Sequence, residues 1–120
     1  MTGFHERSAI VQAQLEAYNA RDLPALLACY AEDARQYALP GATLLASGHA
    51  EIAARMRERF EDPLLHARLL QRSVMGELVI DHEEITRRFP EGPGRIELVA
   101  VYELRDGRIQ NALFRFGARR

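Results

Sequence analysis

Residues 95–116, RIELVAVYELRDGRIQNALFRF, predict two adjacent β-strands joined by a tight turn at Asp106-Gly107. In the first strand every second residue is apolar apart from one tyrosine hydroxyl, and this set is Ile96, Leu98, Ala100, Tyr102 and Leu104. Successive side chains of a strand point to opposite faces of the sheet, so we expect this set to face the core. The second strand should lie beside it.

The register of this strand pair depends on the length of the connecting loop. A loop of three residues, 105–107, pairs Leu98 with Phe114 and keeps the aromatic residues of both strands on one face. We expect this register rather than the one set by a two-residue loop. It leaves several apolar side chains on the outer face, namely Val99, Val101, Ile109 and Leu113. So apolar an outer face predicts a homodimer formed through it.

The period of the apolar residues changes once along the chain. Helical spacing predicts helices over residues 4–20 and about 23–32, and a third helix that opens near Ser47-Gly48 and stops at Asp62-Pro63. Strands are predicted at 34–39 and, where the period becomes two, at 65–75, 77–89, 95–104 and 108–116. Helices followed by a run of strands predict an α+β fold with an antiparallel sheet.

Composition limits the partners of the chain. Its 120 residues suit one domain, which we expect to span residues 1–120. The 16 basic and 17 acidic residues give a net charge of −1, so neither nucleic acid nor an anionic membrane is an expected partner. Cys29 is the sole cysteine, and no signal-like or membrane-spanning apolar run is present. We therefore expect a cytoplasmic protein.

The strand predicted at 77–89 carries polar residues on both faces. Its stretch VIDHEEITRRF, residues 79–89, holds Asp, His, Glu and Glu in succession. One face would carry Leu78, Ile80, His82, Glu84 and Thr86, and the other Val79, Asp81, Glu83, Ile85 and Arg87. Composition alone does not decide which of the two faces is buried.

Three segments carry a resemblance to a known superfamily: YNARDLPALLACYAEDAR (18–35), SGHAEI (47–52) and AVYELRDGRI (100–109). They resemble the NTF2-like superfamily of cone-shaped α+β domains, which includes ketosteroid isomerases, SnoaL-type polyketide cyclases and limonene epoxide hydrolases. The resemblance covers roughly residues 8–117. It implies three N-terminal helices packed on a curved antiparallel sheet that encloses a pocket. It is specific for the fold and not for the function, because this fold carries many activities.

Against the ketosteroid isomerases, the chain lacks the residues that the family uses for catalysis. Gln14 stands where the resemblance places the oxyanion-hole tyrosine, and Ala38 stands where it places the catalytic base. Ala100 stands where it places the second oxyanion donor, a protonated carboxylic acid. Alanine neither donates nor accepts a proton. A steroid isomerase working by the family mechanism is therefore not expected.

The resemblance also implies which face of the strand at 77–89 is buried. The cavity-facing set would be Ile80, His82, Glu84 and Thr86, and the outward set Asp81, Glu83 and Arg87. In limonene epoxide hydrolases an arginine and a carboxylate lie two residues apart on this strand, which corresponds to His82 and Glu84 here. The third residue of that arrangement in the hydrolases is a carboxylate on the last strand, and it corresponds to Phe114 here. Their water-activating arrangement is therefore not expected.

His82 and Glu84 are therefore the predicted catalytic pair. Residues i and i+2 of a strand share a face about 6–7 Å apart at Cα, so Glu84 would orient His82 for proton transfer. The predicted ligand-binding residues are Gln14, Tyr18, Met56, Phe60, Ile80, Thr86, Tyr102, Phe114 and Phe116. An apolar pocket with a few polar groups is typical of a site for a small hydrophobic molecule.

Two kinds of function remain open from the sequence. The first is a cofactor-free isomerase, cyclase or dehydratase that acts by proton transfer. The second is a ligand-binding or dimerisation module without turnover, in which the pair is a polar cluster of structural use. No metal is predicted, because His82 and Glu84 offer two ligands and no third is evident. No other cofactor is predicted, because the chain has no phosphate loop or dinucleotide motif.

Overall fold

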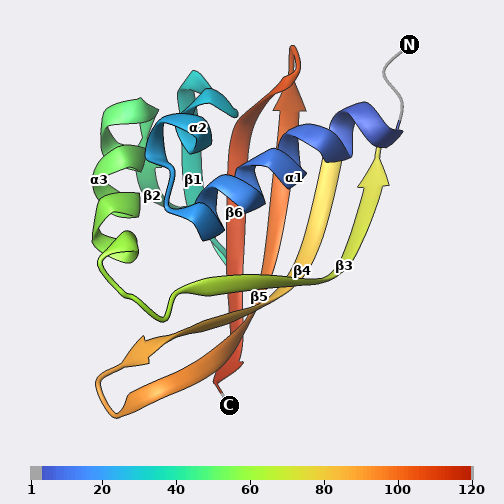
Figure 1. The fold of residues 1–120 in the computed structure, drawn as a ribbon. Helices are drawn as coiled ribbons and strands as arrows, with labels where there is room; N and C mark the ends of the chain where they lie inside the picture. The colour runs from blue at the N-terminus through green and yellow to red at the C-terminus, as the bar shows by residue number, and fades with distance from the viewer. Residues whose placement is uncertain (1–3, 120) are drawn as a thin grey trace.

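The computed structural model describes residues 4–119, and their side chains from Arg7 onward. The helices are α1 (Phe4–Ala20), α2 (Leu23–Ala28) and α3 (Gly48–Phe60). The strands are β1 (Tyr30–Ala38), β2 (Thr43–Ser47), β3 (His66–Met75), β4 (Leu78–Phe89), β5 (Gly92–Arg105) and β6 (Arg108–Arg119). Within the described residues they form one sheet in the order β2-β1-β6-β5-β4-β3 (Figure 1). Neighbouring strands are antiparallel except β1 and β6, which are parallel.

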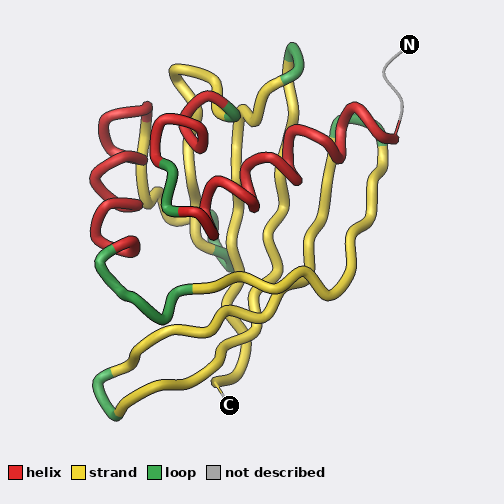
Figure 2. Tube along the Cα trace, viewed as in Figure 1, coloured by secondary structure: helices red, strands yellow, loops and turns green. Residues whose placement is uncertain are grey.

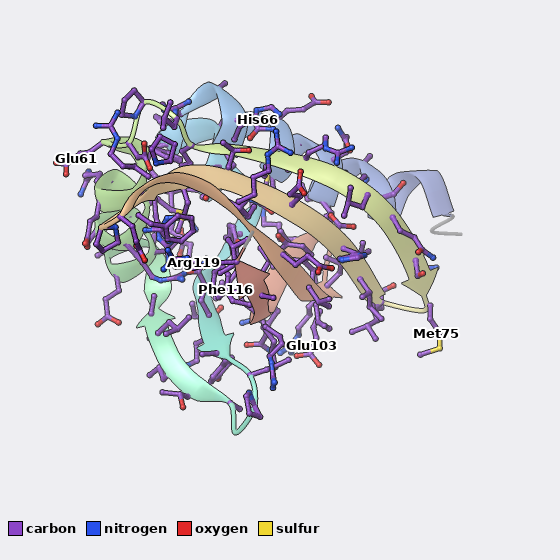
Figure 3. The ribbon with its side chains drawn as sticks, turned by 90° about the horizontal axis from the view of Figure 1, so that it is seen from below. Glu61, His66, Met75, Glu103, Phe116 and Arg119 are labelled. Carbon is purple, nitrogen blue, oxygen red and sulfur yellow. The ribbon has the colours of Figure 1, made fainter. Side chains whose placement is uncertain are left out.

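The helices cover one face of a strongly curved sheet (Figure 2). Helix α1 runs across the strands, and α3 stands beside β1 and β2. Seen from below, β3 and β4 arch over the molecule (Figure 3). The core fills the space between helices and sheet, with Val11, Leu26, Ile52 and Val79 fully buried. The predicted fold class, three helices on a curved sheet, is confirmed.

Helix α2 is shorter than the helix predicted over residues 23–32. The Asp22 side chain caps its start by accepting a hydrogen bond from the Ala25 N–H at 3.2 Å. The helix ends early because the chain then joins the sheet, where the Ile109 N–H donates to the Cys29 carbonyl at 2.9 Å. Strand β1 therefore begins before the strand predicted at 34–39, and β2 is a strand that the sequence did not predict. None of the helices in the described part of the chain has the length and apolar character needed to cross a membrane.

The hairpin between β5 and β6 turns through two residues. Asp106 and Gly107 form the turn, with φ of 51° and 78°. The predicted three-residue loop is therefore wrong, and so is its register, because Leu98 pairs with Phe116 rather than with Phe114.

A bulge in β6 nevertheless puts the aromatic residues on the predicted face. Gln110 is an extra residue between the pairs formed by its two neighbours. It brings Ala112 rather than Asn111 opposite Tyr102, so the inward set of β6 matches that of β5. The two-residue turn pairs Ile109 with Leu104, so Ile109 points inward, where it is fully buried. The prediction that Ile109 lies on the outer face is therefore wrong.

Strand β4 presents to the interior the face opposite to the one predicted. Its hairpin with β5 turns through Pro90 and Glu91, because Phe89 pairs with Gly92. Odd-numbered residues of β4 therefore lie opposite even-numbered residues of β5, so Glu83 pairs with Leu98. Since the even set of β5 faces the core, the inward residues of β4 are Val79, Asp81, Glu83 and Ile85. The predicted inward set, Ile80, His82, Glu84 and Thr86, is on the outer face.

Candidate functional site

A small pocket lies between helices α1 and α3 and the inner face of the sheet. Its volume is about 50 Å³. The lining residues come from both helices and from β1, β4, β5 and β6: Gln14, Leu15, Tyr18, Tyr30, Gln36, Arg55, Met56, Arg59, Glu83, Ile85, Leu98, Tyr102, Phe114 and Phe116. Most of this wall is apolar or aromatic, and a few polar groups converge on it. This composition is that of a small-molecule site.

Glu83 is the only carboxylic acid that lines this pocket among the described residues. Its neighbours across the strands are Leu69 and Leu98, and its exposed fraction is 4%. Burial and, to a smaller extent, the nearby charge of Asp81 raise the pKa of Glu83 to about 8, against an opposing effect of Arg72. The carboxyl is therefore predominantly protonated at neutral pH.

The Asp81 carboxylate forms an ion pair with Arg72. The Arg72 guanidinium on β3 donates to both Asp81 oxygens, at 2.7 Å and 2.9 Å, and to Gln12 Oε1 at 3.0 Å. This two-point contact is the favoured geometry for arginine and a carboxylate. Because Arg72 is engaged in this way, Glu83 two residues further along β4 forms no ion pair with any described residue.

Three tyrosines surround Glu83 in the pocket wall. Burial raises the pKa of Tyr18, Tyr30 and Tyr102, and the charge of Glu83 contributes to the rise for each of them. The Tyr30 hydroxyl accepts a hydrogen bond from Gln36 Nε2 at 3.3 Å. All three phenols therefore stay neutral at physiological pH and can donate a hydrogen bond to a bound oxygen.

Gln14 on α1 adds an unsatisfied acceptor. Its Oε1 atom is buried and has no hydrogen-bond partner among the described residues. A buried acceptor without a partner costs about 1–3 kcal/mol. A ligand or water molecule that donates a hydrogen bond in the pocket would recover this cost.

The structure brings most of the predicted ligand-binding residues together. Gln14, Tyr18, Met56, Tyr102, Phe114 and Phe116 all line the pocket. Phe60 lies behind this wall, with its ring edge-on to Tyr18 at 5.7 Å between centroids. Ile80 and Thr86 lie on the other face of β4, so their predicted place in the pocket is wrong.

The predicted catalytic pair, His82 and Glu84, does not form in the pocket. His82 Nε2 lies 2.6 Å from Glu97 Oε2 on the outer face of the sheet. Glu84 is buried on that face and contacts Arg68 at 3.3 Å. Both placements follow from the two-residue β4–β5 loop, which turns even-numbered β4 residues away from the helices.

Sequence reasoning missed five polar residues of the wall: Tyr30, Gln36, Arg55, Arg59 and Glu83. The length of the β4–β5 loop was the available signal for Glu83. For Arg55 the signal was helical spacing, because it is one turn from Ile52 on the apolar stripe of α3. Tyr30 gave no such signal, because the predicted strand at 34–39 misses the start of β1. Gln36 lies within that predicted strand, to which no inward face was assigned.

The matched family agrees with this architecture. Residues 11–112 match the sequence profile of the SnoaL-like domain. The chain belongs to the SnoaL-like domain family. The match spans α1 to β6 and so includes nearly all of the pocket wall of this SnoaL-like chain. No curated protein is found to match it.

Solved structures similar to this SnoaL-like chain share its fold. An NTF2-like protein of unknown function from Burkholderia pseudomallei is 21% identical, with a TM-score of 0.82 over 98% of this chain and 92% of that one. A candidate polyketide cyclase from Sinorhizobium meliloti is 24% identical, with a TM-score of 0.74 over 88% and 93%. An LEH-like epoxide hydrolase from Mycobacterium tuberculosis is 18% identical, with a TM-score of 0.77 over 93% and 83%. At these identities the similarity establishes the fold.

Proposed function

We propose that the pocket binds a small, mostly apolar carbonyl compound and that Glu83 transfers a proton within it without a cofactor. The observation that carries this proposal is a single carboxyl, buried among apolar and phenolic side chains, whose pKa is raised to about 8. A carboxyl with such a pKa is a much stronger base than an exposed one, and it is also an acid at neutral pH. Both the ionised and the protonated form of Glu83 are therefore present near neutral pH.

The proposal gives a part to Glu83, to two of the tyrosines and to Gln14. Ionised Glu83 would remove a proton from the carbon next to the ligand carbonyl, which leaves an enolate. Neutral Tyr102 or Tyr18 would donate a hydrogen bond to the enolate oxygen, and Gln14 Oε1 would accept one from a ligand hydroxyl. Protonated Glu83 would then return the proton to a different carbon or to an oxygen. Isomerisation, cyclisation and dehydration all use this sequence of proton transfers.

Proton exchange on a simple ketone tests this function. With 2-indanone in D₂O, we expect the protein to accelerate exchange of the hydrogens next to the carbonyl, measured by ¹H NMR. Glu83→Gln should lower the enzymatic rate by about 100-fold or more, the usual effect of removing a general base. The rate should rise with pH up to about 8, as Glu83 ionises.

Glu84→Gln is the matched control, because it changes a neighbouring carboxyl on the opposite face of β4. It should exchange 2-indanone at the wild-type rate. Equal rates for wild type and Glu83→Gln would refute proton transfer by Glu83 and would favour a ligand-binding module without turnover.

We also propose that the outer face of the sheet pairs with a second copy of the chain. Val99, Val101 and Leu113 lie on this face and are half-buried in the single chain. Sedimentation velocity should show a dimer at micromolar concentration, and Val101→Glu should yield monomers because it buries a charge in the interface. Leu70→Glu, at an exposed position of β3, should stay dimeric. A monomeric wild-type protein would contradict the proposal.

A further inference from the structure

Arginine side chains from two elements gather at the entrance of the pocket. Arg55 and Arg59 lie one turn apart on α3 and line the pocket itself. They also line an adjoining cavity of about 290 Å³, to which Arg87 of β4 contributes. Arg87 has the same parity on β4 as Glu83, so it stands on the inner face of the sheet. The apolar pocket therefore adjoins a second cavity, the vestibule, which is lined by three cationic side chains.

None of these three arginines forms an ion pair with any of the described residues. Each guanidinium lies over an aromatic ring instead: Arg55 over Phe114 at 5.5 Å, Arg59 over Phe116 at 5.9 Å and Arg87 over Phe89 at 5.0 Å. Stacking occupies the flat face of a guanidinium and leaves its N–H edge available. Arg55 uses one donor on Gln36 Oε1, at 2.6 Å.

The two carboxylates of the vestibule compensate this charge only in part. Glu58 lines the vestibule but is exposed. Asp62 accepts hydrogen bonds from two backbone N–H groups, Arg88 at 2.6 Å and Leu64 at 2.9 Å, and the charge of Arg87 adds to the lowering of its pKa. Three arginines against two carboxylates leave an excess of positive charge. Burial lowers the pKa of Arg55, and the like charge of Arg59 lowers it further. Holding like charges together at a half-buried entrance costs free energy, which a bound anion would recover.

We propose that the ligand of this pocket carries a carboxylate, which Arg55, Arg59 and Arg87 hold in the vestibule while the apolar body enters the pocket toward Glu83. This inference rests on the proposed function of the same pocket and adds the class of its substrate, an apolar carboxylic acid. The planar N–H edge of arginine matches a carboxylate in two-point contact. The apolar rings beneath the guanidinium groups exclude water from that contact, which strengthens it.

A matched pair of probes separates charge from shape. Naphthalene-2-carboxylate and naphthalene-2-carboxamide have the same ring system and differ in charge, and their fluorescence is free of tryptophan background because the chain has no tryptophan. We expect the wild-type protein to bind the carboxylate about tenfold more tightly than the amide, as charge-assisted hydrogen bonds allow. This preference should shrink at high salt.

Variants of single arginines on α3 and β4 identify the side chains that bind the carboxylate. Arg59→Gln should lower carboxylate affinity by about fivefold or more and leave amide affinity unchanged, because it removes charge-assisted hydrogen bonds. Arg87→Gln should act in the same direction. Arg57→Gln, at an exposed position of the same helix, is the matched control and should bind both probes as the wild type does.

The outcomes separate this inference from the function on which it rests. Equal affinity for the two probes, or equal weakening of both by Arg59→Gln, would overturn the carboxylate inference and leave proton transfer by Glu83 standing. A carboxylate preference that survives in Glu83→Gln, with no exchange of 2-indanone by the wild type, would support the inference and refute the proton transfer. Failure of both probes to bind at millimolar concentration would overturn the pocket as a ligand site and the inference with it.

Discussion

Glu83→Gln should be more stable than the wild-type protein at pH 8, and the two should converge in stability near pH 4.5. The pKa of Glu83 is about 8 in the folded protein and 4.5 for an ordinary glutamate. Between these values the unfolded chain ionises while the folded chain keeps the proton, so the stability of the wild type falls as pH rises. A slope near 1.4 kcal/mol per pH unit gives a loss on the order of 4 kcal/mol across this range.

Urea unfolding of both proteins at intervals from pH 4.5 to 9 measures this effect. Glutamine has the size of protonated glutamate and no titrating group, so the difference between the two curves isolates Glu83. Other titrating groups, including the histidines, act on both proteins alike and cancel. Two parallel curves would show that the carboxyl ionises normally in the folded state, and the proposed acid–base chemistry would lose its basis.

Arg72→Met should destabilise the protein by about 3–5 kcal/mol, the cost of leaving one member of a buried ion pair without its partner. The side chains of Asp81 and Arg72 are only 1% and 11% exposed, and both Asp81 oxygens depend on Arg72. The pKa of Glu83 should rise further in this variant, because Arg72 opposes its rise in the wild type. The loss of stability is read from the midpoint of urea unfolding at pH 7.

The double variant Arg72→Met with Asp81→Leu tests the reason for this loss. Removing both charges should restore most of the lost stability, since an apolar pair of similar volume can replace a buried ion pair. Glu91→Gln is the control, because it breaks an ion pair with Arg119 whose side chains are both well exposed. It should leave the unfolding midpoint nearly unchanged. A double variant as unstable as Arg72→Met would show that packing, rather than uncompensated charge, is responsible.

The sequence predicted the elements of the fold better than the faces of its strands. The inner face of β5 was predictable, because its apolar residues alternate without interruption from Ile96 to Leu104, and α1 was predictable from the helical spacing of Val11, Leu15 and Tyr18. The inward face of β4 was not predictable in this way. One of its faces carries Asp81 and Glu83 among apolar residues, and the other carries His82 and Glu84. Which face of β4 points into the core depends on the number of residues in the loop to β5.

That loop was misjudged because glycine and proline normally mark turns. The run from Pro90 to Gly94 indicated a five-residue connection, yet β5 begins at Gly92 and pairs up to Phe89. The inward face of β4 was predicted from the family resemblance instead, which placed His82 rather than Glu83 in the pocket. Most of the aromatic wall, by contrast, was predictable because Tyr18, Tyr102, Phe114 and Phe116 lie on α1, β5 and β6, whose faces do not change with that loop.

The bulge at Gln110 determines which single-codon deletions in β6 leave the pocket intact. Loss of that one codon would give β6 a regular ladder from the turn to Phe116, in which Glu103 still pairs with Asn111 and every inward residue stays inward. Loss of the codon for Leu113 would instead turn Phe114 and Phe116 away from the pocket. Among descendants of this gene, length changes between the turn and Phe116 should therefore be confined to position 110.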